Sequence, residues 1–152
     1  MTEAELRRVL EDSVRETLDA MFFTACLGAP EPGGAPLPEM AAQVVFEGSP
    51  SWRLTLCMAA GTARSLAASF LGEEEDAVSE RQVGDVFCEL ANMVCGFVLS
   101  RVESAAEFRL GAPRILEPGA AGRPRGAMVH AVETGAGVLE AALEMEDQIC
   151  PP

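Results

Sequence analysis

Apolar positions recur at helical spacing in three segments of the chain. The first runs from Thr2 to about Phe23, the second covers residues 63–71, and the third covers residues 79–103. Capping boxes, in which a hydroxyl and a carboxylate or amide satisfy free backbone amides, open the two long segments: Thr2 with Glu5, and Ser79 with Gln82. The third segment carries an apolar stripe made of Val83, Val86, Leu90, Met93 and Phe97. We predict three helices, each with one buried face.

Five further segments have the composition of β-strands. They are residues 43–47, 52–58, 107–116, 127–133 and 138–145. Turn residues at 48–51 and 134–137 join the first two and the last two into hairpins, and the proline- and glycine-rich residues 28–38 predict a loop. Helices that precede and interrupt hairpin-linked strands predict one α+β domain over residues 1–152. Its sheet should be antiparallel or mixed, with the helices packed on one face.

The charge of the chain excludes some classes of partner. Its 152 residues carry a formal net charge of −13, and nucleic acid and anionic membranes repel such a chain at long range. Arg123 and Arg125 form a local basic cluster, and the glycines around it predict a loop rather than a phosphate site. The N-terminus lacks the pattern of a secretory signal, and no run of about 18 apolar residues could cross a bilayer. We therefore expect a cytoplasmic protein.

Metal and disulfide chemistry are not expected from the cysteines. There are five of them, an odd number, with no CxxC pair, and the single histidine is His130. Cysteines in such a pattern are small buried hydrophobes in a reducing compartment. We expect no cofactor of the chain's own.

Four positions of the third helical segment form the candidate site. Asp85, Glu89, Asn92 and Gly96 follow one another in steps of four, three and four residues, so they lie on one face of the helix. A glycine inside a helix costs about 1 kcal/mol relative to alanine. Gly96 should therefore give clearance, either to an approaching partner or to a neighbouring helix of the same fold.

The chemistry open to this face is limited, because no histidine, activated nucleophile or set of metal ligands accompanies it. A carboxamide such as that of Asn92 can hold a water through its oxygen and donate from its nitrogen. A glutamine has this role in GTP hydrolysis, where positioning and electrostatics supply most of the rate. Such a helix could complete another protein's phosphate site. The alternative is an ordinary solvated helix face.

The chain resembles the CheC/CheX/FliY family of chemotaxis phosphatases, and it is most similar to the small CheX-like members. The family signature is an acidic or hydroxyl residue, a glutamate, an asparagine and a downstream proline. Asp85, Glu89, Asn92 and Pro113 match it here. The order of helices and strands fits the family over nearly the whole chain.

The resemblance implies a phosphatase that acts on a phospho-aspartyl response regulator of the CheY type, in chemotaxis or two-component signalling. Asn92 would orient the attacking water, and Glu89 would contact the regulator's lysine. Asp85 would be a supporting position, Gly96 would allow close approach, and Pro113 would complete the motif. The regulator would supply the catalytic Mg²⁺.

The first helical segment carries a weaker copy of the motif. Asp12, Glu16 and Asp19 have the spacing of the acidic, glutamate and asparagine positions, and Phe23 stands where the glycine would be. An ionised Asp19 cannot donate as an amide does, and it would repel a phosphoryl group. The segment is either a diverged, inactive repeat or a coincidence in an acidic helix.

Other functions stay open. A non-catalytic CheX-like scaffold could sequester or localise a response regulator, and the acidity favours it, because Asp85, Glu89 and residues 73–76 would approach a receiver's own acidic pocket. A flagellar switch component of the FliY kind is a third hypothesis, although nothing here resembles a further rotor-binding domain. Family members that pair their sheets suggest a homodimer formed through sheet edges.

Overall fold

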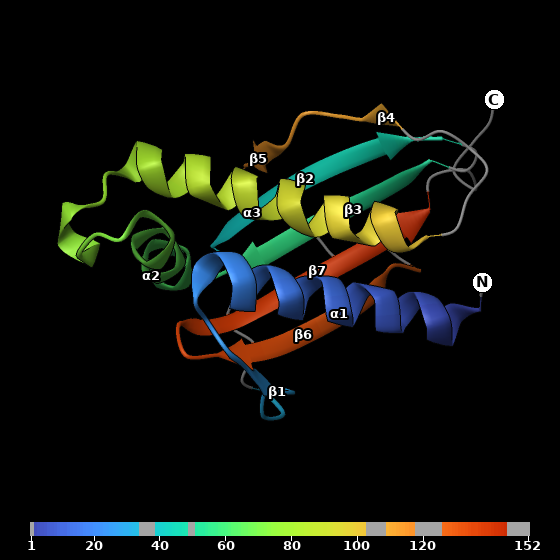
Figure 1. The fold of residues 1–152 in the computed structure, drawn as a ribbon, viewed down its shortest axis with the longest axis horizontal. Coiled ribbons are helices and arrows are strands. Elements are labelled where there is room, and N and C mark those ends of the chain that lie inside the picture. The colour runs from blue at the N-terminus through green and yellow to red at the C-terminus, as the bar shows by residue number, and fades with distance from the viewer. Residues whose placement is uncertain (1, 34–38, 49–50, 103–108, 118–125, 146–152) are drawn as a thin grey trace.

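The computed structural model describes residues 2–33, 39–48, 51–102, 109–117 and 126–145 (Figure 1). Its helices are α1 (Glu3–Phe22), α2 (Ala60–Leu71) and α3 (Glu80–Arg101), with a short 3-10 helix, η1 (Glu75–Ala77). Its strands are β1 (Cys26–Gly28), β2 (Met40–Glu47), β3 (Trp52–Met58), β4 (Arg109–Leu110), β5 (Arg114–Leu116), β6 (Met128–Thr134) and β7 (Gly137–Met145). The start of the predicted strand at 107–116 and the basic cluster at 123–125 lie outside the described residues.

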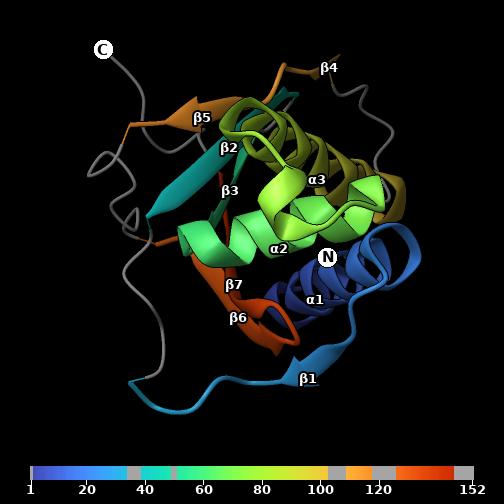
Figure 2. The same cartoon turned by 90° about the vertical axis from the view of Figure 1, so that its left-hand side faces the viewer.

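The strands form one antiparallel sheet, and the three helices cover one of its faces (Figures 1 and 2). The strand order is β1-β6-β7-β3-β2-β4, and β5 also pairs with β2. The predicted α+β architecture is confirmed. β1 was not expected, since its three residues lie beside a segment with the composition of a loop. The predicted strand at 107–116 is two short strands, and between them Gly111 donates its N–H to the carbonyl of Val45 at 2.8 Å.

The sheet has the same arrangement when it is read from either edge. A short edge strand pairs with the first strand of a hairpin, and the second strand of that hairpin lies at the centre. The strand after α1 is β1, which pairs with β6, and the two short strands after α3, β4 and β5, both pair with β2. The two hairpins meet at the centre through β3 and β7. Each half of the chain therefore supplies a helix, an edge strand and a hairpin, and each edge strand joins the hairpin of the other half. This exchange favours a diverged repeat over coincidence for the two copies of the motif.

The core lies between the helices and the sheet, and it corrects one prediction about α3. The buried side chains of this helix are Val83, Val86, Phe87, Leu90, Ala91, Val94, Cys95 and Val98. Met93 and Phe97, which we placed on the buried stripe, are only partly buried. Two sets of positions fit the helical period equally well: 83, 87, 90, 94 and 98, and 83, 86, 90, 93 and 97. The packing of α3 against the sheet buries every member of the first set. By length and composition alone α3 could cross a membrane, but 44% of the tested window is buried inside the fold, and one such helix is weak evidence for a membrane span.

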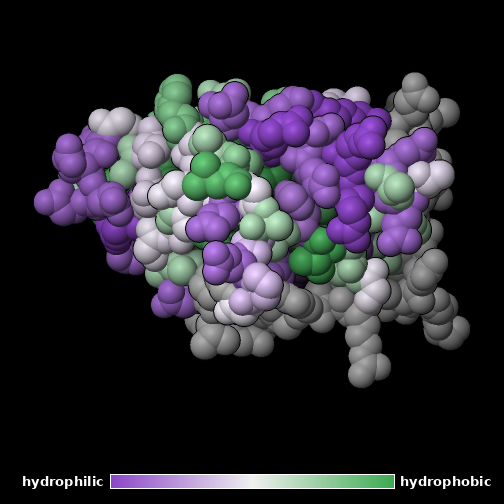
Figure 3. Space-filling model, turned by 90° about the horizontal axis from the view of Figure 1, so that it is seen from below, coloured by the Kyte–Doolittle hydropathy of each residue, from purple (hydrophilic) through white to green (hydrophobic). Residues whose placement is uncertain are grey.

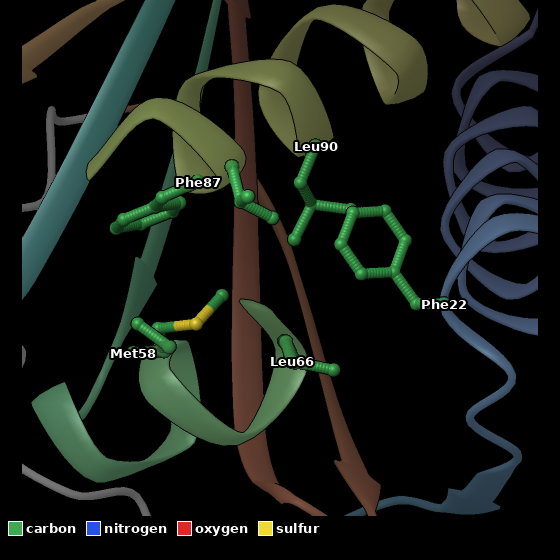
Figure 4. Close-up of a pocket in the computed structure, with 7 residues that line it drawn as sticks. Phe22, Met58, Leu66, Phe87 and Leu90 are labelled. Carbon is green, nitrogen blue, oxygen red and sulfur yellow. The ribbon is translucent and has the colours of Figure 1, made fainter. Parts of the chain in front are cut away.

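The three helices meet around a cluster of apolar side chains at one end of the molecule. Figure 4 shows Phe22 from α1, Leu66 from α2, and Phe87 and Leu90 from α3 gathered around the same space as Met58 of β3. The ring of Phe22 also stacks on Phe70 of α2, with their centroids 4.9 Å apart. These contacts fix the positions of α1 and α3 relative to each other.

Candidate functional site

The helix that carries the candidate site is anchored at its start. The Ser79 hydroxyl accepts the N–H of Gln82 at 3.1 Å, and the Gln82 side chain accepts the N–H of Ser79 at 2.8 Å, so the predicted capping box is present. Arg64 of α2 donates to the carbonyl of Val78 and forms an ion pair with Glu80. The first turn of α3 is therefore fixed both by its own cap and by a neighbouring helix.

The acidic residues of the site are free for a partner. Asp85 and Glu89 are exposed, and within the described part of the chain neither forms an ion pair or a hydrogen bond. Burial, followed by the charges of these two carboxylates, raises the pKa of the Cys88 thiol between them. Burial raises the pKa of Cys95 to about 12. Both thiols are thus protonated and unreactive at neutral pH, as expected of structural cysteines.

Asn92 is the unusual residue of this face. It is half-buried, and its side-chain oxygen Oδ1 is buried without a hydrogen-bond partner among the described residues. Leaving a buried acceptor unpaired costs about 1–3 kcal/mol, and most buried polar groups avoid it. The Asn92 side-chain oxygen therefore makes no hydrogen bond to the described part of the fold.

Gly96 has space around it, which decides between the two explanations for this glycine. It is exposed, and a Cβ built on it would meet no atom within 4 Å. Close packing against a neighbouring helix of the same fold is therefore ruled out. Within the described structure, the space at this position is open.

Gly96→Ala is expected to raise the free energy of unfolding by about 0.5–1 kcal/mol, because alanine restricts the unfolded chain and has room in the helix. Gly84→Ala is the matched control, since Gly84 is also in α3 with open space at its Cβ position. Urea denaturation of both variants tests this. A Gly96→Ala protein less stable than wild type would show that the fold itself needs the glycine.

The weaker copy of the motif on α1 is engaged within the chain. Asp12 pairs with Arg15 at 2.8 Å, and Glu16 pairs with Arg101 at the end of α3. The Arg101 guanidinium also donates to the carbonyl of Phe97 at 3.3 Å and lies 5.2 Å from the centre of its ring. Glu16 is thus paired within the chain, whereas Glu89 forms no ion pair among the described residues, so the α1 copy differs from the α3 copy in contacts as well as in sequence.

Pro113 is not brought together with the other site residues by any contact that the structure gives. It is half-buried in the link between β4 and β5, beside β2 at the edge of the sheet. The structure adds a feature that the sequence did not indicate, a groove of about 350 Å³ between α1 and α3 that Met21, Met93, Gly96, Phe97 and Ser100 line. Met21 lies about 75 residues before the other four lining residues, and no pattern in the sequence connects it to them.

The family model described as "Chemotaxis phosphatase CheX" matches residues 40–128, which is more than half of the chain. The chain belongs to the CheX family. The matched segment contains α3 and leaves α1 outside, so it includes only the copy of the motif with an asparagine. No match was found among curated proteins.

Solved structures of CheX-family proteins share the fold of the chain. The CheX of Borrelia burgdorferi, solved in a complex with CheY, BeF₃ and Mg²⁺, is 16% identical with a TM-score of 0.74, over 91% of this chain and 96% of that one. A CheX of Desulfovibrio desulfuricans is 14% identical with a TM-score of 0.73, over 93% and 99% of the two chains. The CheX of Vibrio vulnificus is 18% identical with a TM-score of 0.71, over 95% and 99%.

Proposed function

We propose that this CheX-family protein dephosphorylates the phospho-aspartate of a CheY-type receiver, with Glu89 and Asn92 as the working pair. The observation that carries the proposal is the Asn92 carboxamide, which has a buried oxygen without a partner on a helix face whose carboxylates are free. A polar group that costs folding energy and lies beside an exposed glutamate is suited to bind a water or a phosphoryl group in a second protein.

In the proposed reaction this chain supplies positioning. The Asn92 carboxamide holds a water in line with the acyl phosphate, and the Glu89 carboxylate pairs with the lysine of the receiver. Asp85 supports the approach one turn earlier on the helix, and Gly96 leaves room for the partner one turn later. The receiver holds the Mg²⁺. Among the described residues of this chain, no group of three metal-binding side chains comes together.

The second candidate function is a scaffold that binds a receiver without turnover. Its support is the charge of the surface, because among the described residues the carboxylates of Asp85, Glu89 and η1 form no ion pair, in a chain with a net charge of −13. Bringing them to an acidic receiver pocket costs electrostatic energy, which the Mg²⁺ and lysine of the receiver would have to offset. The solved Borrelia complex, which holds CheX together with CheY, BeF₃ and Mg²⁺, supports the first candidate.

The two functions are separated by the rate at which phosphorylated receivers lose phosphate. We expect the wild-type protein to accelerate phosphate release from at least one member of a panel of Mg²⁺-loaded phosphorylated receivers. Binding should favour the beryllofluoride-loaded form of that receiver over the free form. Binding to both forms without acceleration of any receiver would reject the phosphatase and support the scaffold.

A further inference from the structure

The groove between α1 and α3 is an apolar surface that the proposed chemistry does not use. Met93 and Phe97 line it on α3, and Met21 lines it from the last turn of α1. Met21 is 40% exposed, and Phe23, which follows it, is 79% exposed with a φ of 51°. Figure 3 shows hydrophilic side chains over the N-terminal half of α1 and hydrophobic ones toward its end and β1. Apolar side chains thus gather where α1 ends.

The groove continues the face that carries the candidate site. On a helix, Gly96 lies one turn beyond Asn92, and Ser100 lies one turn beyond Gly96, so the groove begins where the working pair ends. A partner that contacts Glu89 and Asn92 therefore also covers the groove, unless its surface turns away within one helical turn. Gly96 lies at the junction and leaves open space there.

The groove also offers a source of affinity that does not depend on charge, which the acidic face of the candidate site lacks. Two acidic surfaces gain little from long-range attraction, so the affinity of the complex has to come from another source. Apolar burial is independent of charge, at roughly 25 cal/mol per Å² removed from water. Methionine side chains are flexible and polarizable, which suits them to a partner's apolar side chain. The glycine lets the partner's backbone approach closely enough to insert it.

We infer that the groove formed by Met21, Met93, Gly96, Phe97 and Ser100 is the docking site for an apolar side chain of the receiver, presented from the rim of its phospho-aspartate pocket. The inference rests on the proposed function for the identity of the partner. It divides the interface into a part that performs the chemistry, at Glu89 and Asn92, and a part that provides affinity and selects the receiver.

Two substitutions test the groove without changing its charge. Met21→Gln removes the apolar wall, and Ser100→Trp fills the space from an exposed position of α3. Leu71→Gln is the control for the first, because Leu71 is 38% exposed in the last turn of α2. Ser69→Trp, at an exposed position of α2, is the control for the second. Circular dichroism and thermal unfolding identify any variant that is not folded.

The measurements are the affinity for a beryllofluoride-loaded receiver and the kinetics of phosphate release. We expect both groove variants to weaken binding and raise KM at least tenfold, with a much smaller change in kcat, whereas both controls bind as wild type does. Asn92→Ala should show the opposite split, with kcat reduced and affinity retained. If wild type accelerates release and the groove variants keep its KM, the groove inference is overturned and the phosphatase stands. If groove variants lose binding although wild type accelerates no receiver, the groove stands and the phosphatase fails.

Discussion

Asn92→Ala is expected to lower the stimulated rate of phosphate release by about 10²–10³-fold, which is the loss typical when one preorganised group is removed from a catalytic site. Its effect on stability should differ from that of most side-chain truncations, which lower the free energy of unfolding. The side-chain oxygen is buried without a partner among the described residues, so its removal takes away an unsatisfied acceptor. We expect the free energy of unfolding to stay the same or to rise by up to about 1 kcal/mol. Single-turnover kinetics and urea denaturation measure the two effects.

Two further variants make this result specific to the carboxamide. Asn92→Asp keeps the shape but replaces the donor with a charge that repels a phosphoryl group, so it should be as inactive as Asn92→Ala. Asp19→Asn creates an amide at the corresponding position of α1. It should not add activity, because Glu16 beside it is paired with Arg101. Full activity of Asn92→Ala on a receiver that wild type dephosphorylates would remove Asn92 from the mechanism.

The helices and the hairpins could be predicted because their signals are local. Both capping boxes are present as the sequence indicated, and Trp52 stacks on Phe46 across the β2–β3 hairpin, with ring centroids 6.3 Å apart. Strand β1 could not be predicted in this way. Its three residues are held by pairing with β6, more than a hundred positions later in the chain, and no local pattern encodes such a contact.

The polar part of the site could be predicted from spacing, whereas its surroundings could not. Helical periodicity places Asp85, Glu89, Asn92 and Gly96 on one face without any knowledge of the fold. Whether Gly96 faced a neighbour or open space depended on where α1 and the sheet lie, and the sequence allowed both. The same holds for Met93, which was assigned to the core: it is partly buried against the core and also lines the groove with Met21. Whether a residue at the edge of a helix's buried face is covered or exposed depends on the elements that pack beside the helix.

The symmetry of the fold explains why one copy of the motif is available and the other is not. Each half of the chain contributes a helix to the same face of the sheet, and the two helices lie against each other. Arg101, at the end of the second helix, reaches the glutamate of the first. Within the described residues Glu89 has no such cation. The glutamate of the first helix is thus paired within the chain, and the glutamate of the second is not paired among the described residues.

Gly137→Ala is expected to destabilise the protein by about 2–5 kcal/mol, the largest stability change that we predict. Gly137 has a φ of +135°, and a Cβ there would lie 2.2 Å from the Oγ1 of Thr62, a buried residue of α2. The backbone conformation costs an L-residue roughly 1–2 kcal/mol, and forced overpacking adds about 1–3 kcal/mol. Urea denaturation with an unchanged m-value should record the loss.

The turn that contains Gly137 provides its own control and connects this loss to the site. Gly135, two residues earlier, has open space around its Cβ position, so Gly135→Ala should change stability by less than about 1 kcal/mol. Thr62 lies in the first turn of the helix whose Arg64 holds the start of α3, and a shift of α2 would loosen that anchor. Gly137→Ala should therefore also reduce receiver binding at temperatures where the protein is still folded. Equal stabilities for the two alanine variants would show that α2 yields to the added methyl group without cost, and that the turn does not position the helices.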